Sequence, residues 1–500
     1  MIIYMVCMCW IIPSGPVKSA AAAWTSTSPP FESRIDFYLP IGRTLSQPLL
    51  SLCIPTCNRA ELLEPLLENI ARESAPFLDR LEIVVSDNAS TDHTEAVVKA
   101  SRLPIIYGKN ASNLGFGNNL LNVTAKLASG HYVWVISDDD IVLPGGIARI
   151  MDSISAAPHV SYHYVNFGWI GPSLRSRLIR QAKPAIPEFL LKNLQCDSRE
   201  WLHLSQLEEL VFLPGKNPSA LFSGTFCFVT RRQFFVDALN WLKPSASVDG
   251  SSVLVDDCFP HAMLTVPRVA GQPIAYIGEP CMLQCVGAWE WKAYANKNMI
   301  FGIHQFFRWL EGQGFGAEGM QRLWSSYYDM AGRLFARMQC FPEENKGFDI
   351  VMHEAIPDAA SRPAFWNAFM NESKLCIEAD HEAEGLARLV REFVGTCPNA
   401  RIGLWGIQGR GYSFLRKSPD LHANMVWVTD KEEVFHGDAL EYADLKVSPP
   451  ESISSAKIDC LVIATRRTFI NDVIDTVSTT LAPGTTIISV DGLAYVEEKT

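Results

Sequence analysis

The sequence predicts an α/β protein in which a doubly wound sheet is followed by a helical segment and a smaller α/β domain. Apolar runs of strand length, at 49–54, 81–86 and 131–136, alternate with stretches whose apolar residues recur at helical spacing. Each run ends in polar residues, as parallel strands do where their carboxyl ends form a ligand-binding edge. The same alternation restarts near residue 400, which indicates a second sheet in the same chain.

Length and composition are typical of a globular protein with several domains. The chain has 500 residues, of which 48% are hydrophobic and 19% are charged, so two or three domains are expected. Its formal net charge of −11 provides no basic surplus to displace counterions from a nucleic-acid backbone, so nucleic acid is not expected as a partner. A nucleotide bound through a divalent metal is compatible with this charge.

Residues 1–48 are expected to be an N-terminal extension and linker. The apolar stretch at 1–12 is too short to span a bilayer and lacks the basic start of a signal peptide. Two cysteine pairs, Cys53/Cys57 and Cys281/Cys285, have no nearby histidine to complete a zinc site. We therefore expect reduced thiols and a cytoplasmic protein, with peripheral association at the inner face of the membrane left open.

A strand followed by an amphipathic helix opens the first domain. The apolar face of this helix consists of Leu62, Leu63, Leu66, Leu67 and Ile70. Pro65 lies within the same stretch and has no amide hydrogen to donate. We therefore expect the helix to begin near Leu63, with Pro65 in its first turn.

The acidic triplet Asp138-Asp139-Asp140 follows the apolar run HYVWVI. Three adjacent carboxylates repel one another, so a fold tolerates them best where a cation or solvent offsets their charge. Oxygen ligands at a strand end suit Mg²⁺ or Mn²⁺, which completes its coordination with water and phosphate oxygens. For the triplet alone, a solvated turn before a helix that opens near Pro144 remains the alternative.

Four sequence pieces, IPTCNRAELL, VVSDNASTD, NLGFGNN and ISDDDIVLP, occur in this order. Together they resemble glycosyltransferase family 2, which has a GT-A fold, and within it the bacterial abequosyl- and rhamnosyl-type O-antigen transferases. The resemblance is strong over 49–150 and weaker to about residue 290, so it implies a GT-A domain at 49–290. It also implies a metal-dependent, inverting sugar transfer with Mg²⁺ or Mn²⁺ as cofactor and a nucleotide-sugar as donor.

The resemblance implies roles for individual residues. Asn88 stands where the family usually carries a second aspartate that reads the base, and asparagine can both donate and accept hydrogen bonds. Asp139 matches the metal-coordinating carboxylate, and Asp140 is implied as a further metal-site residue that acts through water. The residues implied to bind the nucleotide-sugar are Pro55, Thr56, Asn58, Asp87, Asn88, Asn113 and Asp138, with Asn119 in the same turn as Asn113. Ordinary turn chemistry is the alternative for the last two asparagines.

An inverting transfer also needs a base that takes the proton of the acceptor hydroxyl. The segment FSGTFCFVTRRQF, with Ser223 and Gly224 in its turn, resembles the acceptor loop of the family, and VLVDDCFPHAML supplies an acidic pair. The resemblance implies Asp257 as the catalytic base and Asp256 as its neighbouring acid, with Pro260 in the first turn of the next helix. A helix N-cap pair is the alternative.

The second half of the chain divides into two regions. From 291 to 395 apolar and aromatic residues recur at helical spacing, a pattern that more often marks a core than a binding site. The region 396–500 resembles Rossmann-like modules of sugar-modifying enzymes. Candidates for a second nucleotide site are glycines after its first strand and an acid that ends its second strand, namely Gly406, Gly409, Gly411 and Asp430. A packing or oligomerisation domain is the alternative.

The leading hypothesis is transfer of a sugar from a nucleotide-sugar to a hydroxyl of a glycan or lipid-linked oligosaccharide in cell-surface polysaccharide synthesis. A nucleotidyltransferase would also use a metal-bound diphosphate. It would be expected to carry a glycine-rich basic loop after the first strand, and IPTCNRAELL has no glycine. A degenerate transferase that serves as a nucleotide- or sugar-binding scaffold is the remaining alternative, and the intact acidic triplet counts against it.

Overall fold

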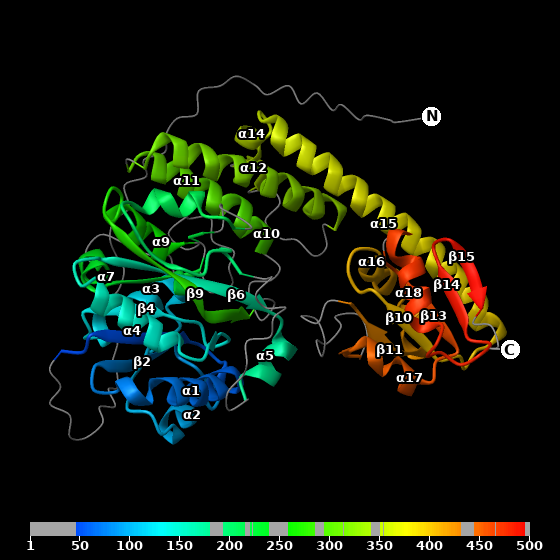
Figure 1. The fold of residues 1–500 in the computed structure, drawn as a ribbon, viewed down its shortest axis with the longest axis horizontal. Helices are drawn as coiled ribbons and strands as arrows, with labels where there is room; N and C mark the ends of the chain where they lie inside the picture. The colour runs from blue at the N-terminus through cyan, green and yellow to red at the C-terminus, as the bar shows by residue number, and fades with distance from the viewer. Residues whose placement is uncertain are drawn as a thin grey trace.

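The computed structural model of the protein describes residues 47–180, 194–215, 221–222, 224–239, 259–285, 295–313, 315–341, 351–353, 355–431, 445–465 and 467–495. They form two sheets with a helical segment between them in the chain, as Figure 1 shows. The expected α/β fold class is confirmed: a mixed sheet comes first, helices follow, and a second small sheet lies near the C-terminus. Residues 1–46 and the acidic pair Asp256-Asp257 lie outside the described residues.

The first sheet has the strand order β3-β2-β1-β4-β8-β6-β9-β5 in its described part, and β7 pairs with β9. Its strands are β1 (Leu50–Thr56), β2 (Leu81–Asp87), β3 (Ile105–Lys109), β4 (Tyr132–Val135), β5 (Ile141–Val142), β6 (Tyr162–Ile170), β7 (Trp201–Leu204), β8 (Phe228–Arg231) and β9 (Ile274–Cys285). β1 pairs in parallel with β2 and β4, so the carboxyl ends of these three strands meet at one edge. β8 is antiparallel to β4 and β6, which makes the sheet mixed.

Both faces of this sheet are buried. Leu52 and Ile54 of β1 lie in the larger core, which also contains residues of α1 (Ala60–Ser74) and α4 (Gly146–Ala156). Cys53, between them, lies in a second core with residues of α3 (Gly115–Leu121) and α7 (Gln233–Ala238). Strands buried on both faces have continuous apolar runs, which explains the pattern seen in the sequence.

Helix α1 begins earlier than expected. It starts at Ala60 and contains Pro65 in its interior, so the expected start near Leu63 is wrong. The physical reason lies outside the helix, because the carboxylate of Asp92 accepts the Ala60 amide at 3.0 Å and fixes the first turn. With this turn secured, the helix tolerates the one hydrogen bond that Pro65 does not supply.

The helical segment packs on the first sheet. Phe306 and Phe307 of α11 (Ile303–Glu311) and Tyr327 of α12 (Ala317–Cys340) are buried in the larger core with residues of the sheet. The interpretation of the aromatic stripes as core is therefore confirmed. Figure 1 shows α11 and α12 along one side of this part of the molecule, with α1 and α2 (Thr94–Ala100) at the opposite side.

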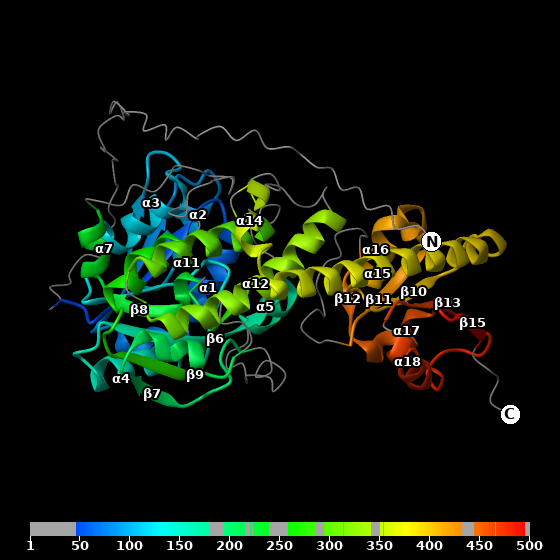
Figure 2. The ribbon, with the colours of Figure 1, turned by 90° about the horizontal axis from the view of Figure 1, so that it is seen from above.

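Helix α15 (Pro363–Thr396) contributes to the larger core and to a separate core under the second sheet. Phe365, near its start, packs in the larger core, whereas Leu386 and Val390 pack against the second sheet. Figure 2 shows the helix running from one part of the molecule to the other. Within the described ranges, no helix has both the length and the apolar character needed to span a bilayer.

The second sheet has the strand order β12-β11-β10-β13-β14-β15. Its strands are β10 (Ile402–Trp405), β11 (Met425–Thr429), β12 (Val447–Ser448), β13 (Cys460–Ile463), β14 (Thr486–Ser489) and β15 (Gly492–Tyr495). All neighbours are parallel except β14 and β15. The helices α16 (Arg410–Lys417) and α18 (Ile470–Val477) complete the predicted βα pattern.

Candidate active site

The carboxyl ends of β1, β2 and β4 form the edge at which the predicted site residues gather. Thr56 ends β1 opposite Asp87, the last residue of β2, and the Asn88 amide donates to the Thr56 carbonyl at 2.8 Å. β4 lies on the other side of β1, so the acidic triplet that follows it is close to the loop after Thr56. Motifs that are far apart in the sequence therefore meet at one edge.

Asp138 and Asp139 converge on the guanidinium group of Arg59. Arg59 Nη1 lies 3.0 Å from Asp138 Oδ1, and Arg59 Nη2 lies 2.7 Å from Asp139 Oδ2. The Thr56 hydroxyl donates to Asp138 Oδ2 at 2.7 Å. The two aspartates are only 1% and 3% exposed, so the arginine offsets charge that water hardly reaches.

The carboxylate of Asp140 is bound to backbone amides. Its Oδ2 accepts the Ser137 amide at 3.0 Å, and its Oδ1 accepts the Cys285 amide at 3.4 Å. Cys285 ends β9, so Asp140 ties the acidic turn to a distant strand of the same sheet. Asp138 and Asp139 therefore both contact the guanidinium group of Arg59, whereas Asp140 has a separate set of partners.

The side chain of Arg175 stabilises the acidic turn by donating hydrogen bonds to backbone carbonyl oxygens. This residue of α5 (Pro172–Leu178) is 2% exposed, and its Nη2 donates to the carbonyl oxygens of Asp138 at 3.0 Å and Leu62 at 2.8 Å. Leu62 belongs to α1, so one guanidinium group connects that helix to the turn that carries the carboxylates.

Burial raises the pKa of two members of the triplet. Desolvation raises the pKa of Asp138 to about 6, although the charge of Arg59 acts in the opposite direction. The pKa of Asp140 is also raised well above its usual range, first by desolvation and then by the charge of Asp139. Both shifts arise mainly from burial, which the charges of the neighbouring arginines offset only in part.

Whether this edge can hold a divalent cation depends on the carboxylate oxygens of Asp138 and Asp139. Within the described ranges, no group of three or more His, Cys, Asp or Glu residues is arranged to hold a metal ion. Asp138 Oδ1 has no hydrogen-bond partner among the described residues, although it lies 3.0 Å from Arg59 Nη1 in the ion pair. Mg²⁺ and Mn²⁺ are often held by one or two carboxylates together with phosphate oxygens and water. The pair Asp138 and Asp139 therefore fits a cation that is shared with a diphosphate.

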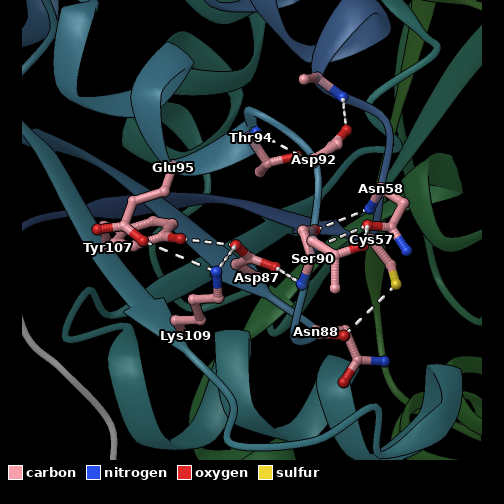
Figure 3. Close-up of polar contacts among 12 residues, drawn as sticks. Cys57, Asn58, Asp87, Asn88, Ser90, Asp92, Thr94, Glu95, Tyr107 and Lys109 are labelled. Atoms are coloured by element: carbon pink, nitrogen blue, oxygen red, sulfur yellow. Dashed lines mark hydrogen bonds and ion pairs between the residues drawn. The ribbon is translucent and has the colours of Figure 1, made fainter.

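Asp87 lies in a buried polar cluster at the end of β2, which Figure 3 shows. Its Oδ1 accepts the Ser90 amide at 2.7 Å, and its Oδ2 accepts the Tyr107 hydroxyl at 2.6 Å. Lys109 Nζ lies 3.9 Å from the same Oδ2. Asp87 is completely buried, so its carboxylate organises the turn after β2 and the end of β3.

Asn88 and Asn113 form one hydrogen-bonded unit. Asn88 Nδ2 donates to Asn113 Oδ1 at 2.7 Å, while Asn88 Oδ1 accepts from Asn110 Nδ2 at 3.0 Å and from the Leu114 amide at 2.9 Å. Asn119 continues the network, because its Oδ1 accepts from Asn110 Nδ2 at 3.0 Å. The asparagines of two motifs thus fix the turn before α3 against the end of β2.

Asn58 shapes the loop after β1. It is exposed and has a φ of 52°, in the left-handed region that asparagine adopts more readily than most residues. Its amide donates to the Ser90 hydroxyl at 2.7 Å, and its Oδ1 accepts the Thr91 amide at 2.7 Å. Asn58 therefore joins the loops that follow β1 and β2, as Figure 3 shows.

The sequence alone did not point to Arg59, Tyr107 or Arg175. Arg59 is the only basic residue in IPTCNRAELL, so a lone cation beside predicted acidic strand ends was a usable signal. Tyr107 and Arg175 gave no short-range signal, because their partners Asp87 and Asp138 lie 20 and 37 positions away in the chain.

The glycines predicted for a second nucleotide site lie between β10 and α16. Gly406 and Gly409 have φ values of +94° and +49°, a region that favours glycine. A Cβ on Gly411 would lie 1.9 Å from the Gly406 carbonyl oxygen, so the loop closes tightly on itself. Asp430, directly after β11, accepts the Ile407 amide at 3.1 Å and ties this loop to the neighbouring strand.

A sheet whose parallel strands end in polar side chains at one edge is typical of nucleotide-binding proteins. Residues 51–230 match a family model described as Glycosyl transferase family 2, and this part of the chain is a family 2 domain. An abequosyltransferase of Salmonella typhimurium is 44% identical over 104 residues, which cover 20% of this chain and 31% of the relative. A GalNAc(5)-diNAcBac-PP-undecaprenol β-1,3-glucosyltransferase of Campylobacter jejuni is 36% identical over 109 residues, which cover 21% and 34%. The chain spans about a third of the length of these curated relatives.

The chain is also similar to solved structures. One is Staphylococcus aureus TarS in complex with UDP-GlcNAc, with a TM-score of 0.37 and 17% identity, covering 58% of this chain and 73% of that one. Another is a mannosyltransferase from Pyrobaculum calidifontis in complex with GDP-Man and Mn²⁺, with a TM-score of 0.36 and 16% identity, covering 66% and 84%.

Proposed function

We propose that the protein transfers a sugar from a nucleotide-sugar donor to a hydroxyl of a glycan or lipid-linked oligosaccharide, with inversion at the anomeric carbon. The observation that carries this proposal is the pair Asp138 and Asp139, which meet the cationic Arg59 at the end of β4 inside a family 2 domain. The Campylobacter relative is named for an undecaprenol-linked acceptor, which supports a lipid-linked acceptor here. A role in cell-surface polysaccharide synthesis follows from this acceptor class.

On the donor side, Asp138 and Asp139 are the residues that would hold Mg²⁺ or Mn²⁺. Such a cation neutralises the negative charge that develops on the departing diphosphate. The guanidinium group of Arg59, which contacts both carboxylates, carries the fork of donors that would bind phosphate oxygens through parallel hydrogen bonds. Thr56 keeps Asp138 oriented through the hydrogen bond at 2.7 Å. Asp140 supports the turn through backbone amides.

The nucleoside side of the pocket is proposed to comprise Pro55, Asn58, Asn88 and Asn113. Asp87 serves this pocket as a positioning residue, because both of its carboxylate oxygens are engaged by Ser90 and Tyr107. Asn58 joins the loop after β1 to Ser90, and Asn110 joins the loop after β3 to Asn88, so the three loops are held together without a ligand. A pre-formed pocket reduces the entropy that is lost when a ligand orders its binding loops.

On the acceptor side, Asp257 is proposed as the base that removes the proton of the attacking hydroxyl, with Asp256 beside it. Support for this assignment comes from the segment that follows the pair. Helix α9 (Pro260–Thr265) begins at Pro260, as the sequence predicts, and packs in the larger core. The helix that follows the acidic pair in the sequence is therefore part of the core of the first sheet.

The test is a thermal-shift screen of nucleoside diphosphates and nucleotide-sugars, with Mn²⁺ and with EDTA. One base is expected to raise the melting temperature in Mn²⁺, with a stabilisation that grows with ligand concentration, to about 2.7 kcal/mol at 100 times Kd. The nucleotide-sugar of that base is then incubated with a polyprenyl-linked saccharide, and the release of nucleoside diphosphate is measured. If none of the nucleotides stabilises the protein in either condition, the proposal is wrong.

A further inference from the structure

Basic side chains gather at the carboxyl edge of the second sheet. Arg410 opens α16 after β10, Lys431 follows β11, and Arg467 follows β13. β10 pairs in parallel with both β11 and β13, so all three residues lie near one edge. From β10 the chain continues to β11 and β12 on one side and returns to β13 and β14 on the other. Ligands of open α/β sheets bind at such a switch point.

Arg410 and Arg467 bind the same carboxylate. Glu382 accepts one hydrogen bond from Arg410 Nε and pairs with Arg410 Nη2, and Arg467 Nε lies 3.1 Å from Glu382 Oε1. Glu382 comes from α15 and not from a loop of the sheet. Two guanidinium groups around one carboxylate form a receptor for an anion. A phosphate group offers them more oxygen atoms and more negative charge than a carboxylate does.

Other observations indicate that this receptor can take a larger ligand. Arg410 Nη1 is buried and has no hydrogen-bond partner among the described residues. A Cβ built on Gly409 would meet no atom within 4 Å, so the space beside this left-handed glycine is open. Phe469 is 38% exposed, and Lys431 Nζ lies 4.2 Å from the centroid of its ring. An exposed aromatic ring near an anion receptor can stack a nucleobase.

We propose that this edge binds a nucleoside diphosphate, whose diphosphate replaces the Glu382 carboxylate between Arg410 and Arg467. The exchange leaves α15 attached to the second sheet, because Asp380 of the same helix still pairs with Arg416 at 2.9 Å and with Lys417 at 2.7 Å. It frees Glu382 on the helix whose first turns pack in the core of the family 2 domain. This inference does not depend on the proposed transferase activity.

The experiment is hydrogen–deuterium exchange of the full chain in EDTA, which removes metal-dependent binding at the first sheet. The probes are ADP, UDP and inorganic pyrophosphate at millimolar concentration. At least one nucleotide is expected to slow exchange over residues 405–412 and to change exchange over residues 378–386. Slowed exchange confined to residues 53–60 and 136–142 would place the ligand at the first sheet and overturn the proposal. Equal protection by pyrophosphate and both nucleotides would overturn the assignment of a nucleoside.

Three variants test the receptor. Arg467→Gln changes a residue whose side chain is 59% exposed, and it is expected to weaken binding about 10-fold or more through the loss of a charge-assisted contact. Glu382→Gln removes the competing charge and is expected to tighten binding about 10-fold. Arg391→Gln breaks the exposed pair with Asp420 on the same part of the chain and should leave affinity unchanged.

Glu382→Gln separates the proposal from a purely structural ion-pair cluster. If Glu382 serves only to hold α15, the variant lowers the melting temperature and leaves nucleotide affinity equal to that of the wild type or weaker. Either affinity result would overturn the proposal, as would the absence of protection over residues 405–412 with all three probes in both the wild type and Glu382→Gln.

Discussion

The two sheets of this protein present opposite charge patterns at their carboxyl edges. At the first edge, the carboxylates of Asp138 and Asp139 surround the guanidinium group of Arg59. At the second edge, the guanidinium groups of Arg410 and Arg467 surround the carboxylate of Glu382. In each case a group of the protein occupies the centre of a cluster of opposite sign. Under the two proposals above, the first cluster would take a metal cation with its nucleotide, and the second would take an anion without a metal.

The two clusters also differ in how deeply they are buried and in which part of the chain supplies the residue at their centre. Asp138 and Asp139 are 1% and 3% exposed, and Arg59 follows β1 in the same domain, so the first cluster is part of the fold. The Arg467 side chain is 59% exposed, and Glu382 comes from a helix that joins two cores. Separating buried partners leaves uncompensated charge, whereas exposed partners are replaced by water. The contact between Arg467 and Glu382 should therefore open at a smaller free-energy cost than the first cluster, whereas the pair of Arg410 and Glu382, whose side chains are 12% and 17% exposed, is itself largely buried.

The largest expected effect concerns chemistry, which should occur only at the first edge. Asp257→Asn removes the proposed base but keeps the size and most hydrogen bonds of the side chain. Turnover is expected to fall about 10²–10⁴-fold, because general-base catalysis typically contributes this factor. Donor affinity should stay within a few-fold, because the base acts only when the acceptor attacks. Steady-state kinetics and nucleotide calorimetry measure the two quantities separately.

Asp256→Asn is the matched control for this change and should be the milder of the two. If Asp256→Asn proves more damaging, the assignment within the pair is shifted by one residue. If neither change slows turnover, the base lies elsewhere and the site assignment is wrong.

The second prediction concerns the cation at the first edge. Asp139→Asn removes a ligand charge from a strand end and no core contact, so the fold should persist. Mn²⁺-dependent nucleotide binding should be abolished, and turnover should fall at least about 100-fold, which corresponds to about 2.7 kcal/mol of transition-state stabilisation. Calorimetry with Mn²⁺ and activity assays provide the measurements. Asp79→Asn, at a side chain that is 75% exposed, is the control. Normal turnover of Asp139→Asn would refute the metal assignment.

Strands with continuous apolar runs could be predicted from the sequence because burial on both faces leaves a local signal. Thr56 and Asp87, which end β1 and β2, and Asp138, which follows β4, could be located in the same way, since each comes at or shortly after the end of such a run. The contacts at those ends could not, because they depend on pairing across the sheet. The early start of α1 illustrates this, since the carboxylate that fixes it belongs to Asp92, 32 positions away. The sequence marked the glycine loop of the second sheet but not Glu382, whose role depends on where α15 crosses that edge.

The third prediction tests how firmly Arg59 belongs to the first cluster. Arg59→Met keeps much of the aliphatic stem and removes the cation, which leaves two buried carboxylates unpaired. In EDTA the free energy of unfolding is expected to fall by about 3 kcal/mol, because breaking a buried ion pair costs about 3–5 kcal/mol. Mn²⁺ with the cognate nucleoside diphosphate should restore part of this loss. The measurement is urea denaturation in both conditions.

Arg80→Met is the control for the arginine change, because Arg80 is about half exposed and its ion pair with Asp79 is long, at 4.0 Å. It should change stability by less than about 1 kcal/mol. If Arg59→Met is as stable as wild type in EDTA, then Arg59 is not the counter-charge of the acidic pair, and the contrast between the two edges fails.

The smallest expected effect concerns the support of the nucleoside pocket at Asp87. Tyr107→Phe removes the hydroxyl that donates to Asp87 Oδ2 at 2.6 Å and keeps the ring in the core. Desolvation, followed by the contact with Asp87, raises the pKa of Tyr107, so the hydroxyl is protonated and can donate at pH 7. Loss of this donor should lower the free energy of unfolding by about 1–3 kcal/mol, since the bond serves a buried charged acceptor.

Lys109→Gln is the comparison, because Lys109 Nζ is 3.9 Å from the same oxygen and its side chain is 32% exposed. Lys109→Gln should lower the free energy of unfolding by less than about 1 kcal/mol. Urea denaturation at pH 7 measures both variants, and donor calorimetry should show weaker binding for Tyr107→Phe. Equal stability losses in the two variants would mean that the charge of Lys109 matters as much as the Tyr107 hydroxyl. A normal donor affinity in Tyr107→Phe would show that Asp87 does not position the pocket.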